Sequence, residues 1–148
     1  MTTDALKFLQ AYIKEMISIG GENLPKTISA RLGAKLAKLY KEKGISSIDS
    51  GLKKSYTVLD ATAQINRKND NDKEIEVAIK HRKKFCPIGG KYDPEKADLI
   101  QKSVCIPYTV GFLNEMDPQF KYKWDIHECI LNTNTNYCRY TLYLEKRE

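Results

Sequence analysis

A chain of 148 residues is the usual length of one domain, and it is long enough to bury a sizeable apolar core. Its 41% hydrophobic and 30% charged residues exclude a disordered segment, and no run approaches the ~18 apolar residues that a membrane-spanning helix needs. The net charge of +6 could attract nucleic acid, but lysines alternate with acids along most of the chain, which favours an ordinary solvated surface.

The N-terminal residues indicate in which cellular compartment the protein is expected. They lack the basic and then apolar layout of a secretory signal, so we expect a cytoplasmic protein, with residues 1–148 forming a single domain. That compartment is reducing. The four cysteines of the chain are therefore expected as thiols or metal ligands rather than as disulfides.

Three amphipathic helices are predicted in the N-terminal part, because apolar residues recur there at helical spacing. Asp4 can cap the first helix, and the pair Gly20-Gly21 ends it. Ser47 or Asp49 can cap the third. The predicted helices span 4–20, 23–44 and 47–59, within a helical part of about 4–60.

Small residues repeat along the second predicted helix, at Ala30, Gly33, Ala34 and Ala37. A helix without bulk on one side lets another backbone approach closely. The strip therefore predicts either close helix packing inside the chain or a contact between subunits. In the second case the protein would be a homodimer, for which the aromatic segment 120–124 is another candidate surface.

From Thr62 the hydrophobic pattern changes to alternation, which is typical of strands. Ile75, Val77 and Ile79 alternate with charged residues, and the polar segment 69–72 has turn chemistry, so we expect a β-hairpin at the start of the C-terminal part, about 61–148.

The next segment is basic and then rich in glycine. The basic run 81–84 is expected to be a solvated strand end. The loop 88–91 follows Cys86-Pro87 and contains two glycines, but its spacing is not that of a phosphate loop, so no nucleotide site is predicted there.

A fourth helix is predicted to begin at Pro94 and to carry Cys105. Pro107 should kink or break this helix, because proline removes a backbone donor. The helix is expected to resume at about 108–113 and to end before Asp117-Pro118.

Two antiparallel strands complete the chain. Apolar and polar residues alternate over 120–130, a polar segment at 132–136 turns the chain, and 138–144 returns. In a regular hairpin Cys138 would lie on the apolar face, while Cys129 would point to the other. Only a bulge or a distorted turn would bring the two sulfurs together, and we predict one near 132–136.

All four cysteines lie in the C-terminal part, and His127 stands beside Cys129. Two interpretations remain open. The cysteines either converge on a zinc site or pack separately as small hydrophobic residues, since no spacing matches the C-x-x-C knuckle. The residues concerned are Cys86, Cys105, Cys129, Cys138 and His127.

These features resemble the 4-vinyl reductase domain family, as found in a stand-alone archaeal vinyl-4-reductase family protein. The resemblance rests on a Cys-Pro pair after a strand, a cysteine in the next helix, an acidic residue beside Cys129, and Cys138 opening the last strand in Cys-Arg-Tyr-Thr-Leu. It implies an α+β fold of N-terminal helices packed on an antiparallel sheet, similar to transport-particle subunits and to nitric-oxide-sensor-like ligand-binding domains. It also implies an apolar cavity and a dimer.

The resemblance also implies zinc, which phenol-sensing members of this family hold through three cysteines and a glutamate. Cys105, Cys129 and Cys138 match the cysteines. Ile126 stands three residues before Cys129, where the acid is expected. The candidates for the fourth ligand are Cys86, His127 and Glu128.

Two functions compete. The first is a sensory or carrier module that binds a hydrocarbon or aromatic molecule and contains a structural zinc. The second is a metal-dependent enzyme of tetrapyrrole or related small-molecule metabolism, which is disfavoured because the common catalytic motifs are missing and only two histidines are present. Nucleic-acid binding ranks last, because no recognition motif accompanies the positive charge. The residues expected to line the ligand cavity, each also an ordinary core residue, are Tyr108, Phe112, Trp124 and Tyr140.

Overall fold

The computed structural model describes residues 3–67 and 73–148. The helical segments within these ranges are α1 (Thr3–Gly20), α2 (Asn23–Glu42), α3 (Ile48–Thr57), α4 (Pro94–Ile100), the π-helical turn η1 (Gln101–Cys105), α5 (Ile106–Met116) and α6 (Ile130–Thr133). The strands are β1 (Thr62–Arg67), β2 (Glu74–Lys80), β3 (Phe120–Glu128) and β4 (Tyr137–Lys146). The predicted turn at 69–72 lies outside the described residues.

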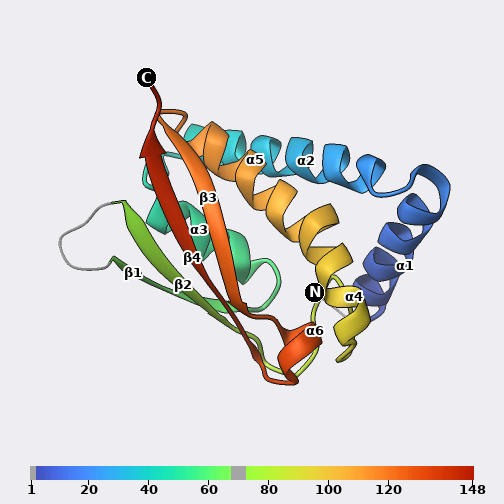
Figure 1. Ribbon diagram of the computed structural model, residues 1–148. Helices are drawn as coiled ribbons and strands as arrows, with labels where there is room; N and C mark the ends of the chain where they lie inside the picture. Colours follow the sequence, from blue (N-terminus) through green and yellow to red (C-terminus); the bar gives the residue numbers. More distant parts are fainter. Residues whose placement is uncertain (1–2, 68–72) are drawn as a thin grey trace.

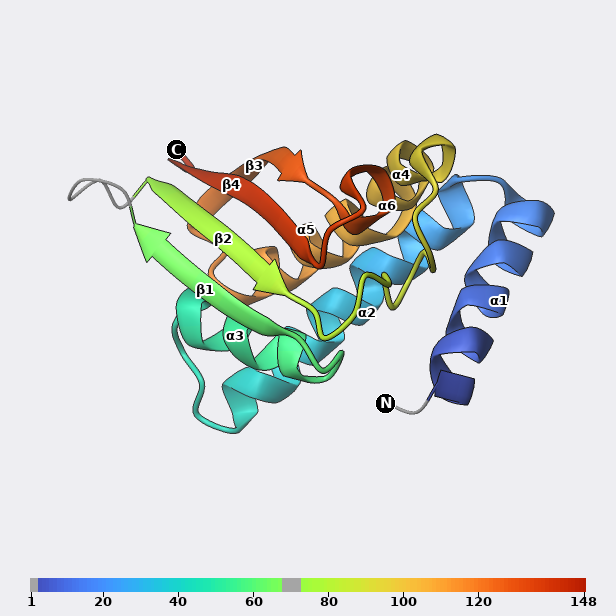
Figure 2. The same ribbon diagram turned by 90° about the horizontal axis from the view of Figure 1, so that it is seen from below.

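The fold is α+β, as predicted. The four strands form one antiparallel sheet in the order β1-β2-β4-β3, and helices α2, α3 and α5 cover one of its faces (Figures 1 and 2). No helix in the described ranges has the length and apolar character to cross a membrane.

Two apolar clusters fill the interior. The main cluster lies between the sheet and helices α2, α3 and α5, with Phe112 and Leu142 at its centre. The second lies at the end of the sheet, where α1, α4, η1 and α6 meet around Ile100, Ile130 and Leu131. Figure 2 shows α1 at the end of α2, away from the sheet. All four cysteines border this second cluster.

The strip of small residues on α2 packs against α5 inside the chain. A Cβ on Gly33 would lie 2.1 Å from the carbonyl oxygen of Tyr108, and a Cβ on Gly111 would lie 2.1 Å from that of Ala30. The two helices therefore meet backbone to backbone. Of the two interpretations of the strip, the structure supports packing inside the chain.

The break expected at Pro107 takes a milder form. Helices α4 and α5 are joined without interruption by the π-helical turn of η1, which ends at Cys105, two residues before the proline. A π-helical turn widens the helix locally, and such turns are frequent at functional sites. Ser47 caps α3 as predicted, its hydroxyl accepting from the Ser50 amide at 3.1 Å, and Pro94 begins α4. The predicted cap of the first helix is wrong, because α1 begins at Thr3 and Asp4 lies in its first turn.

Candidate functional site

The four cysteines come from four different segments. Cys86 lies in the loop after β2, Cys105 ends η1, Cys129 follows β3, and Cys138 is near the start of β4. Cys86 and Cys129 are buried, and the other two are partly buried. Segments that are far apart in the sequence therefore bring all the sulfurs to one end of the sheet.

A bulge in β3 places Cys129 and Cys138 on the same side. Ile126 pairs with Tyr140, but the next pair is Glu128 with Arg139, so His127 is the extra residue. One extra residue reverses the face to which the later side chains of a strand point. The predicted irregularity is present, but the register shift lies at 126–128, upstream of the predicted 132–136. The reason is that the chain between the strands forms α6 and a left-handed Asn134 instead of a plain turn.

The thiols of Cys129 and Cys138 share a hydrogen bond. Donation from Cys138 is the main reason why the pKa of Cys129 is lowered to about 6, and bonds from the Gln101 side chain and from the amides of Leu131 and Asn132 add to it. The same bond and burial raise the pKa of Cys138. The pair therefore favours one thiolate and one thiol, and sequence patterns did not indicate the part played by Gln101.

Cys86 lies in a tight loop whose backbone faces its sulfur. The amide of Gly89 donates to Cys86 Sγ at 3.3 Å, and Cys86 and Gly90 exchange two backbone hydrogen bonds of 2.8 Å. Gln10 of α1 donates to the carbonyls of Cys86 and Pro87, at 3.4 and 3.3 Å. Burial raises the pKa of Cys86, while the Gly89 amide and its neighbours act in the opposite direction.

Burial and the neighbouring sulfurs together determine the pKa of Cys105. Burial raises the pKa of Cys105 far above its usual range, and the charges of Cys86 and Cys129 raise it further. Four thiols are a donor set that zinc prefers, so the set fits that metal in kind. In the described ranges, however, no three His, Cys, Asp or Glu side chains form a group that could hold a metal ion as they stand.

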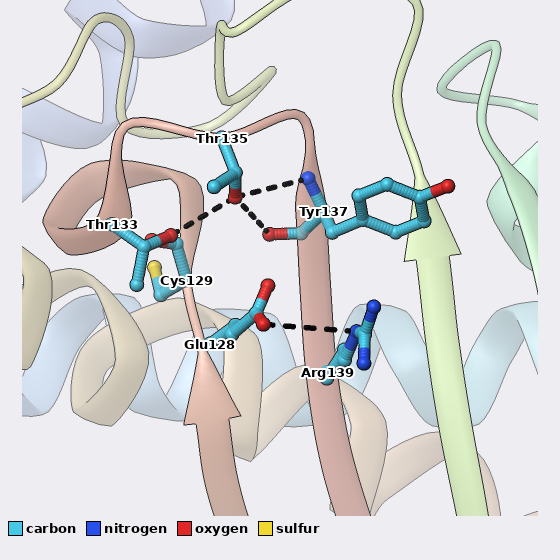
Figure 3. A network of polar contacts seen from close by, with 6 residues as sticks. All are labelled: Glu128, Cys129, Thr133, Thr135, Tyr137 and Arg139. Carbon is cyan, nitrogen blue, oxygen red and sulfur yellow. Dashed lines mark hydrogen bonds and ion pairs between the residues drawn. The ribbon is translucent and has the colours of Figure 1, made fainter.

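The two other candidate ligands have partners of their own. His127 Nε2 lies 2.6 Å from the hydroxyl of Thr141, and Glu128 Oε1 lies 3.8 Å from Arg139 Nε. Figure 3 shows the Glu128–Arg139 pair beside Cys129.

Two threonines hold the connection between β3 and β4. Thr133 donates to the Cys129 carbonyl at 2.8 Å, and Thr135 joins Thr133 to the backbone of Tyr137 (Figure 3). In the sequence, neither threonine could be distinguished from the other polar residues of the predicted turn. These bonds hold the segment from Cys129 to Tyr137, which follows the bulge and includes Cys129.

The predicted ligand-lining residues are found in and beside the main cluster. Phe112 and Tyr140 are buried there, and Trp124 is partly buried against it, with its ring stacked on that of Tyr140 at 5.1 Å and 12°. Tyr108 lies at the α2–α5 contact, where burial, and then Tyr40, raise its pKa to about 12. Trp124 and Tyr140 are therefore in direct contact, and Phe112 belongs to the same cluster.

Polar groups also enter this cluster. The hydroxyls of Tyr56 and Tyr140 lie 2.8 Å apart, and burial is the main cause that raises the pKa of both. The indole Nε1 of Trp124 is buried and has no hydrogen-bond partner in the described part of the chain. Tyr56 was missed from the sequence because its partner is 84 residues away.

Comparison with known proteins gives likeness in structure only. No family model matches the sequence, and no curated protein matches it. Trafficking protein particle complex subunit 3 from Naegleria fowleri, solved covalently bound to palmitic acid, is 10% identical with a TM-score of 0.64, over 97% of this chain and 96% of that one. The phenol-responsive sensory domain of the transcription activator PoxR, solved with phenol, is 16% identical with a TM-score of 0.54, over 94% and 74%. At such identities the likeness shows the fold.

Proposed function

We propose that this protein binds an apolar or aromatic small molecule between helices α2, α3 and α5 and the covered face of the sheet, in a sensory or carrier role. The observation that carries this proposal is the unpartnered indole N–H of Trp124. A buried donor without an acceptor is costly, and native structures seldom retain one without a reason. A hydroxyl, carbonyl or carboxylate oxygen of a ligand would satisfy it.

The surroundings of Trp124 suit such a ligand. Tyr140 offers an aromatic face, and its hydroxyl, paired with Tyr56, can make one further hydrogen bond. Apolar and aromatic walls with a few convergent polar groups are the usual make-up of small-molecule sites. The two similar structures, solved with palmitic acid and with phenol, support a ligand of this chemistry.

The cysteines are proposed to hold a structural zinc. Cys86, Cys105, Cys129 and Cys138 would be the ligands, because His127 and Glu128 bond elsewhere. Zinc binding requires deprotonated thiols, and the lowered pKa of Cys129 favours that form at one of the four sulfurs. Burial raises the pKa of Cys86 and Cys105, and the bond to Cys129 together with burial raises that of Cys138, so at these sulfurs the charge of the metal would have to hold the thiolate. A zinc ion held by four thiolates has no open coordination position for water or substrate. This metal would therefore stabilise the end of the fold, which disfavours the alternative function, that of a metal-dependent enzyme.

The protein is also proposed to be a homodimer through α1. Phe8 and Ile19 of this helix are 71% and 80% exposed, and Tyr12 is exposed beside Phe8. Exposed apolar patches commonly mark association sites. The occupant proposed for this face is a second copy of the chain. The small-residue strip on α2, the other predicted surface, is not available for association because it packs against α5.

Titration with phenol and with palmitic acid tests the binding proposal. Saturable binding by calorimetry, with a matching change in tryptophan emission, supports it. Tyr56→Phe removes a hydroxyl beside the proposed site and should weaken phenol binding, whereas Tyr12→Phe removes an exposed hydroxyl on α1 and should not. If neither compound binds to folded protein, the proposal fails.

A further inference from the structure

The loop that joins β2 to α4 borders a concave site on the surface. A pocket of about 810 Å³ is lined there by four basic residues and two aromatic ones, and a smaller pocket of about 420 Å³ adjoins it at His81 and Arg82. The residues concerned are Arg82, Lys83, Lys84, Lys91, Phe85 and Tyr92. The loop runs from the end of β2 past α6 (Figure 2). The sequence favoured a merely solvated strand end here.

The charge of this pocket is not balanced. Asp60 is the one acidic residue among its lining residues, against the four basic ones. Burial lowers the pKa of His81, which keeps that ring neutral near pH 7. In the ranges that the structure describes, none of the four basic side chains forms an ion pair, whereas Lys102 pairs with Asp98 and Arg67 pairs with Asp49. Like charges gathered in a concave surface attract anions strongly.

The walls of the pocket are held in place. The amide of His81 donates to the Asn136 carbonyl at 2.8 Å, and Asn136 Nδ2 returns a bond of 3.1 Å to the His81 carbonyl. At the other end, the amide of Asp93 donates to the Leu131 carbonyl at 2.8 Å. The loop from His81 to Asp93 is therefore held at both ends, so little order has to be gained on binding.

Two residues that line the pocket have a left-handed backbone conformation. In the described ranges the non-glycine residues with positive φ are Asp60, at 58°, and Asn134, at 52°, and both line the pocket. Asparagine and aspartate adopt this conformation more readily than other residues, and Asn134 does so as the C-cap of α6.

We propose that this pocket binds a small organic anion, namely a carboxylate or phosphate group on an aromatic or short apolar body. Arg82 suits bidentate contact with either group, and the lysines supply further charge-assisted bonds. Phe85 and Tyr92 provide apolar faces for the body of the ligand. The volume lies within the range of small-molecule sites. A nucleic acid would need a basic stripe along the surface rather than one hollow, so it is the less favoured occupant.

The test monitors the backbone amides of Gly90, Lys91 and Tyr92 by NMR while phenyl phosphate, benzoate or neutral benzyl alcohol is added. Saturable shifts are expected with the two anions and none with the alcohol, and comparison of the anions shows which acid group is preferred. The double variant Arg82→Gln/Lys91→Gln should bind about tenfold more weakly or worse. Arg31→Gln/Lys35→Gln, which removes the same charge from the exposed face of α2, should bind as before.

These variants replace exposed side chains, and an unchanged spectrum without ligand checks that they fold. Equal binding of benzyl alcohol, equal weakening in both double variants, or no shift with either anion would overturn the proposal. So would a single-stranded oligonucleotide that shifts amides well beyond this loop and excludes phenyl phosphate, since the pocket would then be part of a nucleic-acid surface.

Discussion

The Cα atom of Gly33 in α2 lies so close to the carbonyl oxygen of Tyr108 in α5 that an added Cβ would stand 2.1 Å from that oxygen. Backbone cannot yield as a side chain can, so Gly33→Ala must push the two helices apart. We expect a loss of about 2–3 kcal/mol in the free energy of unfolding, measured in urea. Gly51→Ala in α3 is the matched control, because its Cβ would first meet the terminal methyl of Met116 at 3.0 Å, a flexible side-chain end, and it should cost much less. Similar losses would contradict the close contact.

The thiol pair predicts a pH dependence in metal-free, reduced protein. The pKa of Cys129 is lowered from 9.0 to about 6, so between these values the folded chain has released a proton that the unfolded chain retains. Stability therefore rises with pH in this window and falls as pH drops towards 6. Above pH 9 the rise ends, because the unfolded chain then loses the Cys129 proton as well. Stability falls from there, because the raised pKa of Cys138 keeps in the folded chain a proton that the unfolded chain releases.

Cys138→Ala removes the donor and should flatten the rise in stability between pH 6 and 9, while Cys105→Ala should retain it. The measurement is urea unfolding across this pH range, with ultraviolet thiolate absorbance as an independent reading of the Cys129 titration. A rise of unchanged slope in Cys138→Ala would show that the pair does not cause it.

Much of the fold follows from local sequence patterns. Helical spacing in 4–59 and alternation in 120–128 are set by which residues must be buried, and such patterns depend on near neighbours. The bulge at Ile126–Glu128 could not be placed in the same way, because the residues that follow it, in α6, pack at the end of the sheet against distant segments, α1 and α4. The hydroxyl pair of Tyr56 and Tyr140 and the thiol pair are contacts between distant segments, which a local pattern cannot specify.

The zinc proposal predicts about one bound metal per chain when protein made without added zinc is analysed. Substituting serine for Cys86, Cys105, Cys129 or Cys138 should lower both the metal content and the melting temperature, because metal binding and folding are coupled. His127→Ala should retain the metal, since that ring bonds Thr141. Negligible metal together with melting that a chelator leaves unchanged would contradict the proposal.

The dimer proposal predicts that charge on α1 separates the subunits. Phe8→Asp/Ile19→Asp should give a monomer by light scattering at micromolar concentration, because each carboxylate would be buried against an apolar partner. Val58→Asp, also at an exposed apolar residue but at the end of α3, should remain a dimer. A monomeric unmodified protein would remove the assembly claim and leave the fold untouched.

The binding proposal is tested most directly at the indole N–H of Trp124. The chain has one tryptophan, so this group gives a single indole resonance in a ¹⁵N NMR spectrum. Because the N–H has no acceptor in the described part of the chain, an oxygen-bearing ligand such as phenol or palmitic acid should bond to it and move the resonance downfield, saturably and with the affinity found by calorimetry. A resonance that stays in place while either compound binds elsewhere, or while neither binds to the folded protein, would contradict the account.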